Sequence, residues 1–463
     1  MKTLKKIVPS DEQLKIIKRI RSGVELIRGA AGSGKTTTAI LKLKLLLLWA
    51  LSRRRRSGVD APVKALILTY NKTLKGYIED LVSDNISTGN ISVEVDTFGR
   101  WSFRALGSPA MSNGYDLHNC AIGSSNEIGL SADFITNEAT YVMGRFLPDD
   151  LDEYLTCRRD GRGAMPRVDR PIRQAILDKV IIPYINYKHS NGINDWNDLA
   201  VALSVIKYCD YDVIIVDESQ DFSANTIRAI LNQLGPDGAA TFVIDTAQRI
   251  YAGGFTWSEV GVTIRPENSC RLAVNYRNTP EIARLSAGLL SCVALDDDGT
   301  APLLDDLSGS LRPIILKGYF NQQVAWCIDY IKSNVDLSKD SVAFLHPKGW
   351  FDFLKSALCR AGLEYIEITG VSEWPQGATN IALCTLHSAK GLDFDHVIII
   401  GLDKKGFPEG DYEIGDDRFE NACRLLSMAI ARARSSVVIG YKEGEQPDVI
   451  SRLDSAYYDE IVL

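Results

Sequence analysis

The stretch from Gly29 to Thr36 reads Gly-Ala-Ala-Gly-Ser-Gly-Lys-Thr and matches the phosphate-binding loop pattern residue for residue. Its glycines let backbone N–H groups turn toward phosphate oxygens, Lys35 can reach the β- and γ-phosphates, and the Thr36 hydroxyl is placed to bind Mg²⁺. Residues 24–27 predict a short buried strand before the loop, and a helix is expected from Thr37, with its N-terminal dipole toward phosphate. The residues expected to hold a nucleoside triphosphate are Gly29, Ala30, Ala31, Gly32, Ser33, Gly34, Lys35, Thr36 and Thr37.

The length and composition predict a multi-domain globular protein. A chain of 463 residues is too long for one ordinary core. Its hydrophobic fraction of 45% and charged fraction of 24% are ordinary for a globular protein. The net charge of -7 excludes indiscriminate polyanion binding, so any nucleic-acid contact needs a local basic patch. The nine cysteines are scattered without a C-x-x-C pair, which predicts a reducing compartment and no structural zinc. Residues 1–10 lack the long apolar core of a secretory signal, and we expect a cytoplasmic protein with no membrane segment.

The apolar run at residues 40–51 is the one membrane-like stretch. It is short, is broken by Lys42 and Lys44, and directly follows the phosphate loop, so it predicts a buried helix. The four arginines at 53–56 are typical of a solvated surface, with direct nucleic-acid contact as the alternative.

Strand-like and helix-like segments alternate along most of the chain, which predicts an α/β fold with parallel sheets. The first strand series continues at residues 65–70, 91–98, 212–216 and 240–244, and it is interrupted by a mainly helical segment at 99–203. A second series follows Cys270, at residues 313–317, 341–346, 381–386, 396–400 and 436–440. The predicted domains are therefore 1–98 with 204–272, a helical insertion at 99–203, and a second α/β domain at 273–463.

Two adjacent carboxylates, Asp217 and Glu218, directly follow the apolar strand at 212–216. A carboxylate at the carboxyl end of such a strand faces the phosphates bound in the same sheet. Asp217 is therefore expected to hold Mg²⁺, with Glu218 orienting and deprotonating the attacking water.

At this point the chain resembles the superfamily 1 helicases of the UvrD/Rep type, because several motifs occur in the family's order. Besides the phosphate loop, the matching stretches are 68–72, 96–98, 216–221, 244–251, 275–278, 387–394 and 424–434. The resemblance implies two RecA-like motor domains with ATP and Mg²⁺ bound in the cleft between them.

The same resemblance implies roles for individual residues. Gln13 matches the position that reads adenine, although it also fits a helix cap formed with Ser10. The remaining roles are a γ-phosphate sensor at Gln248, adenine stacking by Tyr276, a γ-phosphate contact from Arg277, a ribose contact from Asp393 and an arginine finger at Arg432. Since Arg277 and Arg432 lie in the second domain, hydrolysis should require the two domains to close.

The prediction of a nucleic-acid site depends on aromatic residues and on motif matches. Proteins hold single strands by base stacking on aromatic side chains and by basic grooves. For Trp257 the alternative is packing under its own loop, and for His387 it is fixing a turn. The expected strand-binding residues are Tyr70, Asn71, Thr97, Phe98, Tyr251, Trp257 and His387.

The chain departs from the family in three ways. Ser219 stands where alanine is usual, and Asp393 replaces the family's glutamate, which leaves recognition of the ribose open. The span from Arg277 to His387 is long enough only for the second motor domain, so the additional subdomain of long members is expected to be missing, and no nuclease domain is expected after Gly440.

These features predict a minimal DNA translocase or helicase that uses ATP and moves 3′ to 5′ on single-stranded or tailed duplex DNA. A protein partner such as a nuclease or a loader would supply the duplex-splitting surface that this short form is expected to lack. The alternative is a nucleic-acid-triggered ATPase switch that activates a partner effector, as in antiviral defence, with little unwinding. An RNA helicase is the third hypothesis.

Overall fold

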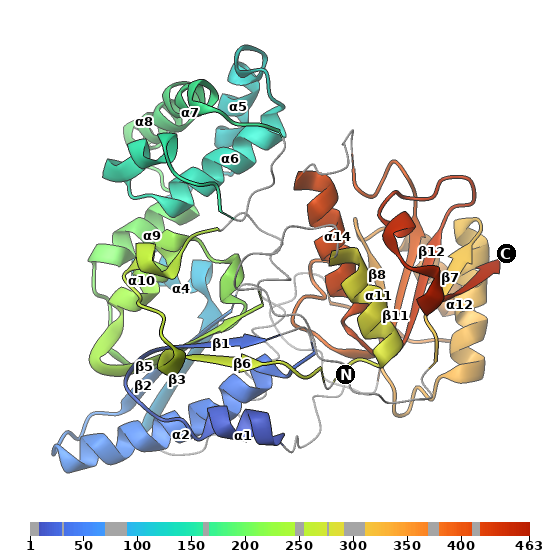
Figure 1. Cartoon of the computed structure of the whole chain (residues 1–463), viewed down its shortest axis with the longest axis horizontal. Helices are drawn as coiled ribbons and strands as arrows, with labels where there is room; N and C mark the ends of the chain where they lie inside the picture. The colour runs from blue at the N-terminus through green and yellow to red at the C-terminus, as the bar shows by residue number, and fades with distance from the viewer. Residues whose placement is uncertain are drawn as a thin grey trace.

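The structure is a computed structural model of the chain. It describes residues 9–29, 32–69, 90–160, 166–245, 254–275, 277–290, 311–368, 379–409 and 417–463. Two parallel sheets, each covered by helices, form two α/β domains, and a group of helices extends from the first (Figure 1).

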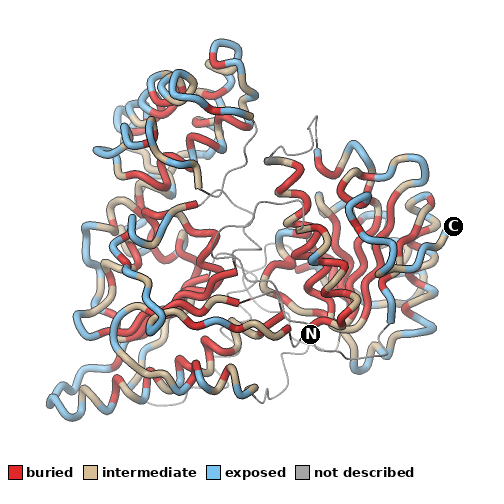
Figure 2. Tube along the Cα trace, in the orientation of Figure 1, coloured by how far each residue is buried: buried red, intermediate tan, exposed pale blue. Residues whose placement is uncertain are grey.

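The first sheet has six strands in the order β3-β2-β4-β5-β1-β6, and every neighbouring pair is parallel. Its strands are β1 (Gly23–Gly29), β2 (Val63–Thr69), β3 (Ile91–Thr97), β4 (Tyr211–Val216), β5 (Leu234–Ile244) and β6 (Ser269–Leu272). Residues that alternate along β2 enter different cores: Ile67 packs on one face of the sheet, and Leu66 and Leu68 pack on the other. Burial on both faces explains why these strands are continuous apolar runs, and the strands are among the buried segments in Figure 2.

Helix α1 (Asp11–Ile17) precedes β1, and α2 (Lys35–Arg56) follows the phosphate loop. Leu43, Leu46 and Leu47 of α2 are buried in the core, which confirms the buried helix predicted at 40–51. None of the described helices is long and apolar enough to cross a membrane. At the end of α2, Arg54 forms an ion pair with Asp212 at 2.7 Å.

A charged pair is buried under α2. The Lys42 ammonium group contacts the Glu25 carboxylate of β1, and the side chains are 1% and 5% exposed. Burial lowers the pKa of Lys42, while Glu25 opposes that shift. We expect Lys42→Met to destabilise the fold by about 3–5 kcal/mol, because it removes the ammonium group from a buried carboxylate whose other ion-pair partner, Arg19, is 3.9 Å away.

Chemical denaturation of the Lys42→Met variant measures this loss of unfolding free energy. The double variant Lys42→Met/Glu25→Leu is the control, since removing both charges should restore most of the stability. Equal losses in the single and the double variant would contradict a role for the ion pair.

The helical segment leaves the first sheet after β3 and returns to it at β4. It contains α4 (Phe98–Ala105), α5 (Tyr115–Ile128), α6 (Ala132–Arg145), α7 (Arg170–Ile176), α8 (Ile182–Asn191) and α9 (Trp196–Val205). Helices α4 and α9 cover the sheet with α10 (Ala224–Asn232), whereas α5 to α8 surround a core of their own (Figure 1). Arg145 joins this core to the first α/β domain through an ion pair with Glu259 at 2.8 Å.

Several predicted element boundaries differ from the structure by a few residues, and one of the differences concerns a predicted site residue. The strand expected at 91–98 ends at Thr97, and Phe98 is the first residue of α4. The Thr97 hydroxyl accepts a hydrogen bond from the Arg100 N–H, and such a cap starts a helix at the following residue.

The second sheet has seven strands in the order β13-β7-β12-β11-β8-β10-β9, again with parallel pairs throughout. Its strands are β7 (Ile314–Lys317), β8 (Val342–His346), β9 (Ile366–Glu367), β10 (Ile381–Thr385), β11 (Phe394–Leu402), β12 (Ala433–Tyr441) and β13 (Asp459–Val462). One face of this sheet carries α11 (Pro280–Leu290) and α14 (Asp417–Ile430), and the other carries α12 (Phe320–Asn334) and α13 (Asp352–Arg360). Strands β9 and β13 were not predicted, because they are short and lie at the sheet edges.

Within residues 311–368 and 379–409, every named helix and strand belongs to the second sheet or packs on it. The predicted domains at 1–98 with 204–272, 99–203 and 273–463 stay a prediction. Helices α4 and α9, which lie within the predicted insertion, pack on the first sheet.

Candidate active site

The phosphate loop is shaped by two glycines with left-handed backbone angles, Gly32 (φ 77°) and Gly34 (φ 75°). A Cβ atom on Gly32 would lie 2.1 Å from the Asn275 Oδ1, and one on Gly34 would lie 2.4 Å from the Gln13 Nε2. Both positions therefore need glycine for backbone angle and for space. Gly34 also caps α2, so the loop leads directly into the helix N-terminus.

Lys35 is the first residue of α2, and its side chain turns back over the loop. Its Nζ donates to the Gly29 carbonyl at 2.8 Å and pairs with the Asp245 carboxylate at 2.9 Å. Thr37, also in the first turn, is half-buried. The Ser33 Oγ is buried without a hydrogen-bond partner among the described residues. A buried hydroxyl and an ammonium group thus face the position that phosphate oxygens take in such loops.

Asp217 directly follows β4 and reaches the start of α2. The Thr36 hydroxyl donates to its Oδ2 at 2.8 Å, while its Oδ1 is buried and has no hydrogen-bond partner in the described part of the chain. Burial, reinforced by the neighbouring Glu218, raises the pKa of Asp217 to about 7. A divalent cation would satisfy the free oxygen and reverse this shift, so Thr36 and Asp217 fit a Mg²⁺ site.

Glu218 has a left-handed backbone (φ 52°), which is uncommon for a residue with a side chain. Its Oε2 accepts a hydrogen bond from the Gln220 Nε2 at 2.5 Å. Burial opposes its ionisation, but the charges of Lys390, Arg432 and Lys35 outweigh burial and lower the pKa of Glu218. The carboxylate is therefore ionised near neutral pH and can accept a proton.

The basic groups beside these carboxylates come from beyond the first sheet. Arg277 lies next to the loop, because a Cβ on Gly32 would be 3.0 Å from the Arg277 Cβ. Helix α14 ends at Ile430, and Arg432 occupies the junction with β12, only 3% exposed. Burial and the nearby Arg277 lower the pKa of Arg432, while Glu218 and other carboxylates oppose the shift. An arginine remains charged under these conditions.

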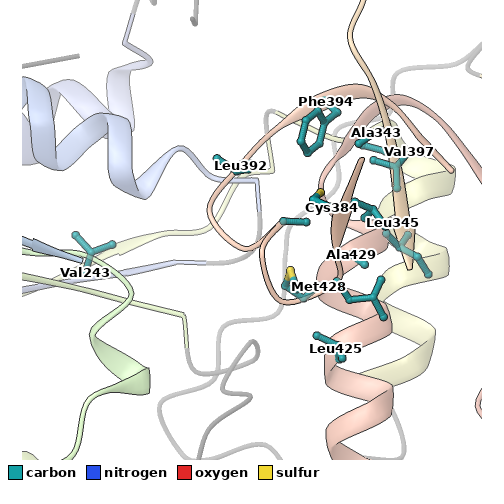
Figure 3. Close-up of a cluster of buried hydrophobic side chains, with 14 of the residues drawn as sticks. Val243, Ala343, Leu345, Cys384, Leu392, Phe394, Val397, Leu425, Met428 and Ala429 are labelled. Carbon is teal, nitrogen blue, oxygen red and sulfur yellow. The ribbon is translucent and has the colours of Figure 1, made fainter. Parts of the chain in front are cut away.

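Lys390 forms the buried ion pair between the two α/β domains. Its Nζ contacts the Asp221 carboxylate and lies 3.7 Å from the Glu218 Oε2, with the lysine side chain 2% exposed. No role was predicted for Lys390, although it lies within a recognised motif, because its partner is 169 residues away in the sequence. Leu392 and Val243 of β5 belong to one cluster of buried apolar side chains, which includes residues of both α/β domains (Figure 3).

Gln13 has the helix-cap role that was the alternative for it, and its contact with adenine stays a prediction. It forms a capping box with Ser10, and its Nε2 also donates to the Ser33 carbonyl at 3.1 Å. Asp393 lies 2.9 Å from the Arg277 guanidinium and 3.6 Å from that of Arg434. In this conformation the Asp393 carboxylate therefore holds arginines, and a ribose contact would compete with these ion pairs.

Seven predicted site residues lie outside the described residues. They are Ala30, Ala31, Tyr70, Asn71, Gln248, Tyr251 and Tyr276.

Two of the expected strand-binding aromatics are packed into the first domain. Phe98 is 7% exposed and contacts Trp101 and Phe222, with ring centroids 5.8 and 6.3 Å away. Trp257 packs edge-on against Phe242 at 5.2 Å, which agrees with the packing alternative. The Phe98 ring is therefore not available for base stacking in this conformation.

The other two described candidates are polar. Thr97 is buried as the cap of α4, with its hydroxyl bonded to the Arg100 N–H. His387 is exposed on the loop that follows β10.

Two exposed tryptophans were missed. Trp196 is 58% exposed at the start of α9, and its ring lies against the backbone of Gly99, which has no side chain in the way. Trp350 is 64% exposed and stacks on His346, with the Lys348 Nζ 5.0 Å from its ring centroid. Both tryptophans lie near the carboxyl ends of sheet strands. Trp350 follows an apolar strand within four residues, so its position could have been inferred from the sequence.

Comparison with known proteins relates the second domain to a helicase family. Residues 351–444 match the family model described as UvrD-like helicase C-terminal domain. DNA helicase II of Escherichia coli (strain K12) is 36% identical over 90 residues, which is 19% of this chain and 12% of that protein. DNA helicase II of Haemophilus influenzae is 35% identical over 66 residues, which is 14% of this chain and 9% of that protein.

Among solved structures, the C-terminal domain of a possible DNA helicase from Lactobacillus plantarum WCFS1 matches with a TM-score of 0.30 and 19% identity, covering 40% of this chain and 98% of that one. The match to the curated relatives spans 12% or less of their length. The similarity to UvrD-type helicases therefore lies in the second α/β domain, at residues 351–444.

Proposed function

We propose that this chain is an ATP-dependent DNA translocase or helicase whose reaction site lies between its two α/β domains. The observation that carries the proposal is the arrangement of charge at the phosphate loop. Lys35, Asp217 and Glu218 of the first domain lie close to basic groups that follow it in the chain, Arg277, Lys390 and Arg432. Phosphoryl transfer spreads negative charge over the γ-phosphate oxygens, and catalysis consists mainly of placing such groups around them.

Each residue has a distinct proposed role. Lys35 would exchange Asp245 for the β- and γ-phosphates, and Thr36 with Asp217 would hold Mg²⁺, which neutralises phosphate charge when bound. Glu218 would orient the attacking water and accept its proton. Arg277 and Arg432 would stabilise the charge that develops on the transferred group.

Movement along DNA would follow from the division of this site between domains. The ion pair of Lys390 with Asp221 already connects the two α/β domains. Nucleotide binding and release would strengthen or weaken such contacts, so the domains would close and open once in each cycle. Domains that grip a strand alternately during this cycle would advance along it.

The proposal of DNA as the substrate draws on the relatives, which are named DNA helicase II. Trp196 and Trp350 are the exposed aromatics we propose for base stacking, together with His387. The 3′ to 5′ direction rests on the family resemblance.

A nucleic-acid-triggered ATPase switch is the second candidate. One observation favours it. The helices and strands within 311–368 and 379–409 all belong to the second sheet or pack on it, so none of them forms a separate surface that could split a duplex. A switch would hydrolyse ATP on binding a strand and signal to a partner without directional movement.

The two candidates can be separated by measuring ATPase, unwinding and stopped-flow translocation on duplexes with a 3′ or a 5′ tail. We expect strand-stimulated hydrolysis and movement toward the 5′ end, both lost in Lys35→Ala with the fold intact. Stimulated hydrolysis without movement would support the switch. If RNA stimulates hydrolysis and DNA does not, the chain would be an RNA helicase and the proposal of DNA as the substrate would fail.

A further inference from the structure

Gln220 joins two parts of the site through a single side chain. It lies on the short 3₁₀ turn Ser219–Asp221 that follows Glu218, and it is 3% exposed. Its Nε2 donates to the Glu218 Oε2 at 2.5 Å, and its Oε1 accepts a hydrogen bond from the Asp245 N–H at 2.9 Å. Both polar ends of the amide are therefore used inside the protein.

The orientation of this amide is determined by its partners. A backbone N–H can only donate, so the amide atom that faces Asp245 must be the oxygen. An ionised carboxylate can only accept, so the amide nitrogen must face Glu218. A reversed amide would lose both hydrogen bonds, which makes Gln220 a rigid connection between these two residues.

Each of the connected residues does something at the phosphate loop. Glu218 is the proposed base and has a left-handed backbone, which costs about 1–3 kcal/mol and persists only where neighbouring groups hold it. Asp245 follows β5, and its carboxylate is paired with Lys35 at 2.9 Å. The hydrogen bonds therefore run from Glu218 through Gln220 to Asp245, and from Asp245 to Lys35.

We propose that Gln220 is a positioning residue that ties the direction of the Glu218 carboxylate to the position of the chain at the end of β5. When Lys35 leaves Asp245 for a phosphate, the Asp245 N–H moves and Gln220 transmits the change to Glu218. The inference rests on the proposed function for the identity of the reaction. The hydrogen-bonded connection itself is a property of the described residues.

A neighbouring residue provides a matched control. The Ser219 hydroxyl donates to the Val243 carbonyl at 2.8 Å, so it also ties the same turn to β5. No hydrogen bond joins the Ser219 side chain to Glu218 among the described contacts. Ser219→Ala therefore removes a connection between turn and strand while leaving the orientation of Glu218 untouched.

The test compares Gln220→Met, Gln220→Glu and Ser219→Ala with the wild-type chain, using ATP with and without single-stranded DNA. Methionine matches the length of glutamine but makes neither hydrogen bond. We expect Gln220→Met to lower kcat by about 10- to 100-fold, the usual effect of losing an outer-shell partner. The KM for ATP should change little, and the stimulation by DNA should fall. The Tm should fall modestly, because the buried Asp245 N–H loses its acceptor. Gln220→Glu keeps the acceptor for Asp245 but places an oxygen against Glu218, so it should not restore kcat. Ser219→Ala should retain kcat.

Three results would overturn the inference: an unchanged kcat in Gln220→Met, an effect confined to KM or Tm, or an equal loss of kcat in Ser219→Ala. Wild-type hydrolysis reports separately on the proposed function. If the wild-type chain hydrolyses ATP normally and Gln220→Met does too, only this inference fails. If the wild-type chain does not hydrolyse ATP, the proposed function fails and the inference fails with it.

Discussion

Replacing Glu218 by glutamine is expected to lower strand-stimulated ATP hydrolysis by about 10²–10⁴-fold, the range that a positioned general base contributes. The substitution keeps the size of the side chain and removes its ability to accept a proton. Lys390 and Arg432 lie close enough to lower the pKa of Glu218, so the wild-type group is ionised and ready to act as a base. Nucleotide binding should persist, since Lys35, Thr36 and Asp217 are unchanged.

Single-turnover hydrolysis and equilibrium binding of ATP measure the two effects separately. Glu127→Gln is the matched control, because this exposed glutamate of α5 pairs only with the exposed Lys179 among the described contacts. Its hydrolysis should equal that of the wild-type chain. Unchanged stimulation in Glu218→Gln would refute the proposed role of Glu218 and the site built around it.

Replacing Arg432 by alanine is expected to lower kcat by about 10³–10⁵-fold, the contribution of an arginine that stabilises the transferred phosphoryl group. The residue is 3% exposed and lies near Glu218 and Asp245 of the first α/β domain and near Asp393 of its own domain. Arg432→Lys should recover only part of the activity, because a lysine keeps the charge but lacks the planar guanidinium.

The KM for ATP and the affinity for DNA should change much less than kcat, since the expected contribution is made in the transition state. Arg360→Ala is the control, because Arg360 lies on the exposed surface of α13 and should be neutral. A buried arginine can also support folding, so the Tm of each variant has to be measured alongside. If Arg432→Ala raised KM and left kcat unchanged, the arginine would bind nucleotide without acting on the reaction.

The parts of the site that follow local rules were predictable. The loop from Gly29 to Thr36 depends on a short pattern of glycines, a lysine and a hydroxyl, and the structure gives it the turn and the helix cap that this pattern requires. Asp217 and Glu218 follow a buried strand, and because the strands are parallel their carboxyl ends meet at one edge of the sheet. Periodicity also predicted ten of the thirteen strands that the structure describes, and it missed β6, β9 and β13.

The contacts that join distant segments were not predictable in the same way. Phe98 has the right motif position for a strand contact, yet its neighbours Trp101 and Phe222 bury it. Asp393 was expected at a ribose and is paired with Arg277 and Arg434 instead. In each case the partner lies elsewhere in the chain or in space, and neither composition nor spacing identifies it.

The sequence by itself determined that this chain has a phosphate loop, two parallel α/β sheets and a set of ordered motifs, because those features depend on residue type at short spacing. Only the tertiary structure decided how the motifs meet. It placed Lys390 against Asp221, and it brought Arg432, which follows α14, into a buried position near Glu218. The physical reason is that buried charges need partners of opposite sign, and folding selects those partners from anywhere in the chain.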